Sequence, residues 1–173
     1  MNDTSIKLGA GTAFPQISWL TVAHGDYAPA ARDGWRMVVV YRGKHCPLCR
    51  KYLDELQELQ ARAHGLSVEV AAVSADPRDR ASAQVAETGW EFPVACDLTV
   101  DQMKRLGLNV SAPRSPEETD RPFAEPGLFV INPQGTLQII DISYVPFSRP
   151  ALGQVFDGIQ LIQRTDYPIR GTA

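Results

Sequence analysis

The feature that most constrains the fold of this chain is a pair of cysteines at the junction of an apolar strand and a helix. Cys46 and Cys49 lie in the run GKHCPLCRKY, directly after the apolar run MVVVY at residues 37–41. The first N–H groups of a helix and the positive end of its dipole stabilise a negative charge placed there. The pattern predicts a redox site in which Cys46 is ionised near neutral pH.

In the predicted geometry Cys46 is the N-cap of the helix, and Pro47 occupies the first helical position, where its missing N–H is no loss. The sulfur of Cys46 then faces the amides of Leu48 and Cys49, which lowers its pKa. Cys49 follows one helical turn later, so it can attack an adduct formed on Cys46.

The charges around the two cysteines also favour the thiolate, because no acidic residue lies between positions 42 and 53. The flanking titratable residues are Arg42, Lys44, His45, Arg50 and Lys51. His45 titrates near neutrality, so it is a candidate for tuning the nucleophile or moving a proton. A solvated His45 that points away from the sulfur is the alternative.

A zinc half-site is the alternative interpretation of a single C-x-x-C pair. Structural zinc takes four ligands, and the chain offers no second cysteine pair, only Cys96, His24 and His64 at scattered positions. Cys96 lies in an apolar stretch and is predicted to be a buried side chain rather than a second resolving thiol. The residues therefore favour a redox dithiol over a metal site.

Composition and charge limit the remaining possibilities. The chain has 173 residues, of which 44% are apolar, and it is predicted to form one domain over 1–173, with a core at about 14–164 and an irregular tail at 165–173. The net charge is −3 and basic residues cluster only around the cysteines, so neither nucleic acid nor a membrane is expected as a partner. Without an apparent leader, a cytoplasmic location is expected.

The hydrophobic pattern alternates strands and helices. Strands are predicted at 16–22, 37–41, 67–74, 91–97, 127–132 and 136–143, and helices at 46–63, 76–89, 100–107 and from 148–150 to about 162. Asp76 is expected to cap the second helix, and residues 23–35 and 109–126 are expected to be loops, the second of them able to act as a lid. In such βαβ units ligands bind at the carboxyl ends of the strands, where the cysteines lie.

Four segments of the chain resemble the peroxiredoxin-like branch of the thioredoxin-fold superfamily, the alkyl hydroperoxide reductase and thiol-specific antioxidant family. They are VVVYRGKHCPLC, VAAVSAD, EFPVACD and GLFVINPQG, and the similarity runs from about residue 35 to 164. The resemblance implies a thioredoxin-like α/β fold, with a central mixed sheet flanked by helices on both faces. It also implies a thiol oxidoreductase in which Cys46 attacks a peroxide or a disulfide, and no metal or organic cofactor is required.

Three positions depart from the family pattern. Peroxiredoxins usually carry a proline seven residues before the nucleophile, a threonine or serine three before it, and commonly an arginine before the strand matching 127–132. Here these positions hold Val39, Gly43 and Pro126. Because positioning supplies much of the rate at such sites, the departures argue against fast peroxide reduction. Arg42 and Lys44 are the cations that could substitute electrostatically.

Glu125 and Pro126 resemble the segment of thioredoxin-like proteins in which a cis-proline lies against the C-x-x-C and helps to bind substrate. A cis bond and an ordinary trans proline that closes the loop are the alternatives here. Thioredoxins also bury an acidic residue six positions before the first cysteine, and this chain has Val40 there. The proton acceptor for Cys49 is therefore not identified, with His45 and Glu125 as candidates.

The predicted mechanism starts with attack by the Cys46 thiolate and ends in a Cys46–Cys49 disulfide, which a cellular reductant such as the thioredoxin or glutathione system reduces.

The predicted function is a thiol-dependent antioxidant oxidoreductase that acts on hydroperoxides or disulfides. The alternatives are a disulfide reductase with negligible peroxidase activity and a non-enzymatic redox-sensing or partner-binding domain. A homodimer is a possible assembly. The predicted site consists of Cys46, Cys49 and His45 as catalytic residues and Arg42, Lys44, Pro47, Glu125 and Pro126 as substrate-binding residues.

Overall fold

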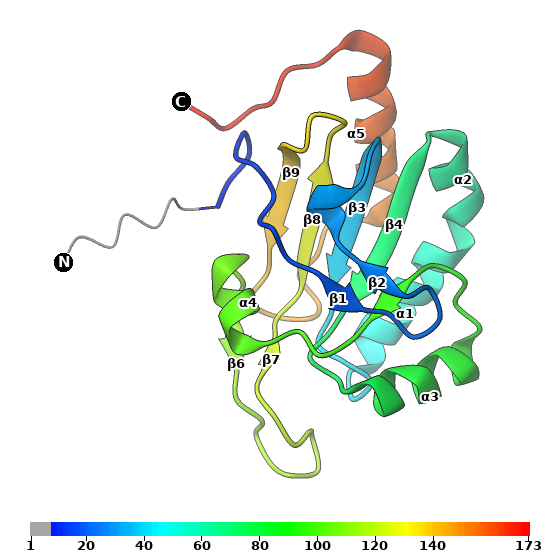
Figure 1. Cartoon of the computed structure of the whole chain (residues 1–173), viewed down its shortest axis with the longest axis vertical. Helices are drawn as coiled ribbons and strands as arrows, with labels where there is room; N and C mark the ends of the chain where they lie inside the picture. Colours follow the sequence, from blue (N-terminus) through cyan, green and yellow to red (C-terminus); the bar gives the residue numbers. More distant parts are fainter. Residues whose placement is uncertain (1–7) are drawn as a thin grey trace, which may run out of the picture.

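A five-stranded mixed sheet forms the centre of the computed structural model, which describes residues 8–173 (Figure 1). In order across the sheet, the strands are β5 (Val94–Ala95), β4 (Val68–Val73), β3 (Trp35–Val40), β8 (Gly127–Ile131) and β9 (Leu137–Ile142). The first three strands run parallel to one another, and β8 and β9 are antiparallel additions. This is the mixed thioredoxin-like sheet that the sequence predicts.

The apolar run of β3 reflects its central place in the sheet. β3 pairs with β4 on one side and β8 on the other, so that Val38 lies between Ala71 and Phe129. Alternate side chains of β3 enter two separate cores, and each core contains apolar residues from β3. A strand buried on both faces favours apolar residues on both, which explains the uninterrupted apolar run from Met37 to Val40.

Helices cover both faces of the sheet. They are α1 (Pro47–Glu58), α2 (Gln60–Gly65), α3 (Arg78–Thr88), α4 (Val100–Arg105) and α5 (Leu152–Thr165). In Figure 1, α1 and α5 lie behind the sheet, and their buried side chains share one core with Met37 and Val39. The other core combines α4 with the N-terminal segment and includes Val38 and Val40. No helix in the described part of the chain is long and apolar enough to cross a membrane.

The predicted strand at 16–22 is mostly irregular. Only β1 (Trp19–Leu20) is a strand, and it pairs with β2 (Asp26–Tyr27), which lies in the predicted loop together with the short 3-10 helix η1 (Pro29–Ala31). The alternation that suggested the strand does bury Ile17, Trp19 and Thr21. The segment covers one face of the main sheet (Figure 1), and at Thr21 it also reaches the sheet's edge, where it forms an isolated antiparallel bridge with Ala95 of β5.

The predicted loop at 109–126 is closed at its base by a two-stranded sheet. β6 (Val110–Ser111) pairs with β7 (Phe123–Ala124), and in Figure 1 the connection between them projects from the lower end of the molecule. A strand of only two residues carries too weak an alternating pattern to be read from sequence.

Two helix starts differ from the prediction. Asp76 does not cap α3; Pro77 is its N-cap residue, because the carboxylate of Asp76 is bound elsewhere, by the amide of Lys44. The last helix starts at Leu152 rather than at 148–150, because the backbone stays extended up to Ala151, its N-cap residue, which has a ψ of 124°. The predicted helix at 46–63 is divided at Leu59 into α1 and α2, although both helices contribute to the same core.

Candidate functional site

The two cysteines lie at the carboxyl end of β3, on the first turn of α1. Cys46 is the N-cap, Pro47 occupies the first position of the helix, and the Cys49 N–H donates to Cys46 Sγ at 3.2 Å. The two sulfurs are 2.6 Å apart, and both residues are free thiols. Cys46 and Cys49 are 2% and 0% exposed. The capping geometry predicted for Cys46 is confirmed, with the amide of Cys49 as its backbone donor.

Hydrogen bonding lowers the pKa of the Cys46 thiol to about 6. The largest cause is the hydrogen bond from the Cys49 thiol, and the Cys49 amide, Arg42 and Arg149 add to it against the effect of burial. The same contact raises the pKa of Cys49, because Cys49 is the donor and burial also disfavours its charged form. A thiol with a pKa of about 6 is roughly nine-tenths ionised at pH 7.

A buried carboxylate holds the turn that leads to Cys46. Asp76, 2% exposed, accepts a hydrogen bond from the Lys44 amide at 2.6 Å and one from the Arg80 guanidinium at 3.3 Å. Gly43 lies against this carboxylate with a φ of +129°, and a Cβ at position 43 would come within 2.8 Å of an Asp76 oxygen. The threonine or serine that peroxiredoxins usually carry three residues before the nucleophile therefore does not fit at position 43.

Arg42 is held in place beside the dithiol by two acidic residues and one aromatic ring. Its guanidinium lies 3.4 Å from a carboxylate oxygen of Glu118 and 3.4 Å from one of Glu125, and it stacks 4.6 Å from the ring centroid of Phe123. Glu125 is 5% exposed and also accepts a hydrogen bond from the Ser111 hydroxyl at 2.6 Å. The structure thus brings the predicted residues Arg42 and Glu125 together as an ion pair.

His45 packs against the same phenylalanine, with its ring centroid 4.7 Å from that of Phe123. Burial is the main cause that lowers the pKa of His45, which favours the neutral imidazole at pH 7. Both ring nitrogens are buried and have no hydrogen-bond partner among the described residues. His45 is therefore neither a solvated surface side chain nor a partner of Cys46 in a hydrogen bond.

The remaining predicted residues have structural contacts of their own. The ammonium group of Lys44 forms an ion pair with Glu87 on α3. Pro126 is buried immediately before β8, and no described peptide bond is cis, so the trans alternative holds at Glu125–Pro126. Val39 is 1% exposed in the core behind the cysteines.

Arg149 is a site residue that sequence reasoning missed. It lies in the connection between β9 and α5, where its guanidinium donates to the Leu48 carbonyl at 2.9 Å and stacks 4.1 Å from the ring centroid of Tyr52. Its charge helps to lower the pKa of Cys46. No local signal could have found it, since about a hundred positions separate it from the helix that it contacts. The family pattern commonly has an arginine at the position of Pro126. In this chain Arg149 supplies a cation near Cys46 instead.

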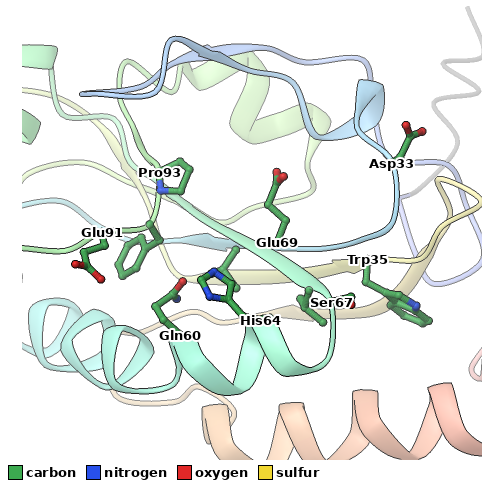
Figure 2. Close-up of a pocket in the computed structure, with 11 residues that line it drawn as sticks. Asp33, Trp35, Gln60, His64, Ser67, Glu69, Glu91 and Pro93 are labelled. Carbon is green, nitrogen blue, oxygen red and sulfur yellow. The ribbon is translucent and has the colours of Figure 1, made fainter.

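A hollow of about 500 Å³ at the other end of β3 and β4 has no part in this geometry. Figure 2 shows Gln60 and His64 on one side of it and Asp33, Glu69 and Glu91 around it. It contains no sulfur-bearing side chain. Among residues 8–173, no three His, Cys, Asp or Glu side chains are grouped so that they could hold a metal ion.

The fold and the dithiol define a class, the thiol oxidoreductases of thioredoxin-like fold. A model of the AhpC/TSA family matches residues 10–140, and the chain belongs to this family. It is a thiol-based oxidoreductase of the peroxiredoxin type. Comparison with curated protein sequences finds no significant match.

Similar solved structures are peroxiredoxins with low sequence identity. A cysteine-to-serine mutant of peroxiredoxin 6 from Arenicola marina has a TM-score of 0.78 and 18% identity, covering 92% of this chain and 75% of that one. Peroxidoxin BcpB from Mycobacterium tuberculosis has a TM-score of 0.73 and 13% identity, covering 88% and 97%. A yeast mitochondrial 1-Cys peroxiredoxin has a TM-score of 0.75 and 16% identity, covering 92% and 78%. These likenesses concern the fold, which agrees with the predicted class.

Proposed function

We propose that this protein is a dithiol peroxidase and disulfide reductase in which Cys46 attacks the substrate and Cys49 resolves the product. The observation that carries the proposal is the pair of buried sulfurs 2.6 Å apart, with the pKa of Cys46 lowered to about 6. Ionised sulfur is the nucleophile in thiol chemistry, and a neighbouring thiol can displace the adduct once it has lost its proton.

With a hydroperoxide, Cys46 Sγ attacks the terminal peroxide oxygen, an S–O bond forms and the O–O bond breaks, and the leaving alkoxide takes up a proton. Cys46 is then a sulfenic acid. With a disulfide, Cys46 Sγ attacks one sulfur and displaces the other as a thiolate. In either case Cys49 gives up its proton and attacks the sulfur of Cys46, so that water or a thiol leaves and the Cys46–Cys49 disulfide forms.

The raised pKa of Cys49 sets the order of the two steps. Cys49 stays protonated while it donates to the Cys46 thiolate, so Cys46 attacks first. After Cys46 has reacted, its negative charge is gone and the main cause that raises the pKa of Cys49 disappears. Cys49 then ionises more readily beside the electrophilic sulfur.

A specific observation favours disulfides as the better substrate. Gly43 and Asp76 occupy the place where a hydroxyl would hold a peroxide, and Val39 and Pro126 replace two further orienting residues. The cations Arg42 and Arg149 remain, and both favour the thiolate. When few groups orient the peroxide, the rate of attack by the thiolate falls most for small peroxides, because correct positioning provides much of that rate.

The test compares second-order rate constants of the reduced protein with hydrogen peroxide, an alkyl hydroperoxide and a small disulfide. We expect all three to exceed those of free cysteine, with the largest margin for the disulfide. Cys46→Ser is expected to reduce each rate by at least about a thousandfold, whereas Cys49→Ser keeps the first step and accumulates the adduct. Rates no faster than those of free cysteine would refute the enzymatic proposal and leave a redox switch, seen as a change in partner binding on oxidation.

A further inference from the structure

A pocket of about 270 Å³ lies on the outer side of α1, the helix whose first turn carries the dithiol. Its floor and walls come from the first two turns of α1 and from the segment between β9 and α5. Leu48 and Arg149 line it, and the hydrogen bond between them joins the pocket to the turn that carries Cys46. Leu48 is two residues from Cys46 and the charge of Arg149 lowers the pKa of Cys46, so the pocket lies near the nucleophile although neither cysteine lines it, in contrast to the hollow of Figure 2.

The pocket carries two cations and one anion without ion-pair partners. Lys51, Glu55 and Arg149 line it, and none of the three forms an ion pair with another described residue. Most other charged groups near the dithiol are paired, as in Lys44 with Glu87 and Arg42 with Glu118. A ligand with two negative groups and one positive group complements this set.

The other six residues that line the pocket are apolar or aromatic, and the sulfurs of the dithiol are almost inaccessible. Phe147 is 77% exposed and Leu48 is 44% exposed, whereas Cys46 is only 2% exposed. The hydroxyl of Tyr52 is already bound to the Pro150 carbonyl at 2.7 Å, so its ring forms a fixed wall. A narrow approach to buried sulfur favours a small thiol as the reductant.

We propose that this pocket binds a low-molecular-weight thiol peptide with two carboxylates and one ammonium group, the chemistry of glutathione. Its carboxylates pair with Lys51 and Arg149, its ammonium group pairs with Glu55, and its thiol faces the sulfur of Cys46. The proposal rests on the function proposed above, because it names the reductant of the Cys46–Cys49 disulfide.

The reduction consumes two thiols. The first thiolate attacks Cys46 Sγ, a new disulfide bond forms, the Cys46–Cys49 bond breaks, and Cys49 leaves as a thiolate that takes up a proton. A second thiol loses its proton and attacks the bound ligand's sulfur, which releases the Cys46 thiolate and an external disulfide. The protein gains two electrons, and two ligand thiols are oxidised.

The first experiment measures how fast glutathione and 2-mercaptoethanol reduce the disulfide form of the full-length protein. 2-Mercaptoethanol is a monothiol without charged groups, so the ratio of the two rates, each divided by the thiolate concentration, isolates recognition from thiol chemistry. We expect glutathione to be faster by about tenfold at low ionic strength, and the ratio to fall as salt is added. Equal rates, or reduction only by a protein dithiol, would overturn the proposal.

Variants of exposed residues on α1 then locate the recognition. Lys51→Glu is expected to lower the rate ratio by about fivefold to tenfold, and Glu55→Ala by about twofold to threefold. Each ratio uses the 2-mercaptoethanol rate of the same variant, so any change in the reactivity of the cysteines cancels. The matched controls are Lys104→Glu on α4 and Glu58→Ala one turn along α1, which lie outside the pocket lining and are expected to leave the ratio unchanged. An unchanged ratio in Lys51→Glu would refute the pocket.

A binding measurement keeps this proposal separate from the proposed function. S-methylglutathione cannot exchange with a disulfide, so its binding does not depend on turnover. We expect NMR titration to shift signals of Leu48, Lys51 and Tyr52 in the wild type, with binding at least fivefold weaker in Lys51→Glu. Binding without formation of a Cys46–Cys49 disulfide would support the pocket and refute the cycle, whereas a cycle without such binding would refute the pocket alone.

Discussion

The segments that follow β3 and β5 each contain a buried cysteine, Cys46 in the first and Cys96 in the second. The two residues are almost equally buried, at 2% and 1% exposed. The pKa of Cys46 is nevertheless lowered to about 6, whereas burial and the charge of Asp97 raise the pKa of Cys96 to about 11. Burial by itself therefore does not decide the reactivity of a thiol in this fold.

The difference lies in what each sulfur faces. Cys46 accepts hydrogen bonds from the thiol and the amide of Cys49 at the start of α1, and two arginines lie nearby. Cys96 faces an acceptor, since its thiol donates to the Leu20 carbonyl at 3.3 Å. Hydrogen-bond donors stabilise a thiolate, whereas acceptors stabilise a protonated thiol. The cysteine after β3 is therefore a nucleophile and the cysteine after β5 is an inert core residue, although both strands end at the same side of one sheet.

Alkylation provides the largest expected contrast. At pH 7 we expect iodoacetamide to react with Cys46 about a hundredfold faster than with Cys96, because an excess of thiolate of about ten-thousandfold is partly offset by the weaker nucleophilicity of a low-pKa sulfur. Mass spectrometry of the reduced protein after timed labelling measures both rates. The Cys46 rate should level off above its pKa of about 6. Similar rates for the two residues would contradict the contrast.

The pH dependence of stability is expected to have opposite signs for the two cysteines. A lowered folded-state pKa adds stability that is complete above the unfolded value of 9.0 and is lost as the pH falls towards about 6. The wild type should therefore gain about 1–3 kcal/mol over Cys46→Ser between pH 6 and pH 9.

For Cys96 the raised pKa adds stability that is present below pH 9 and is lost as the pH rises through about 11. The wild type should therefore lose its advantage over Cys96→Ser in that range. Urea unfolding under reducing conditions at pH 6, 9 and 11 measures both differences, and the same sign for both would show that donors and acceptors do not separate the sites.

Removal of Arg149 is expected to have the smallest effect of the three predictions. Its charge is the weakest of the causes that lower the pKa of Cys46. Arg149→Ala should raise that pKa by about half a unit, so alkylation of Cys46 slows by about twofold at pH 6 and hardly changes at pH 8. Arg170→Ala, which removes another arginine stacked on a tyrosine, is the control and should leave the profile unchanged. A large loss at pH 8 would indicate that Arg149 does more than favour the thiolate.

Local sequence signals predicted the elements that carry the dithiol. The apolar run before Cys46 is β3, the cysteine is the N-cap of α1, and Gly89 ends α3 with a left-handed φ of +70°. These features depend on neighbouring residues, on one strand period or on one helical turn. The prediction was wrong where a distant contact decided the local structure, as at Asp76, whose carboxylate binds the turn before Cys46 instead of capping its own helix.

By itself, the sequence determined that a nucleophilic cysteine begins a helix after a buried strand, because capping and dipole effects act over a few residues. Only the tertiary structure decided which charges surround that cysteine. Arg149 contacts Leu48 across about a hundred positions, Glu125 pairs with Arg42, and Asp76 excludes a side chain at Gly43. Hydrophobic patterning places elements in a fold, but the meeting of individual polar side chains depends on loop paths and packing that no local pattern encodes.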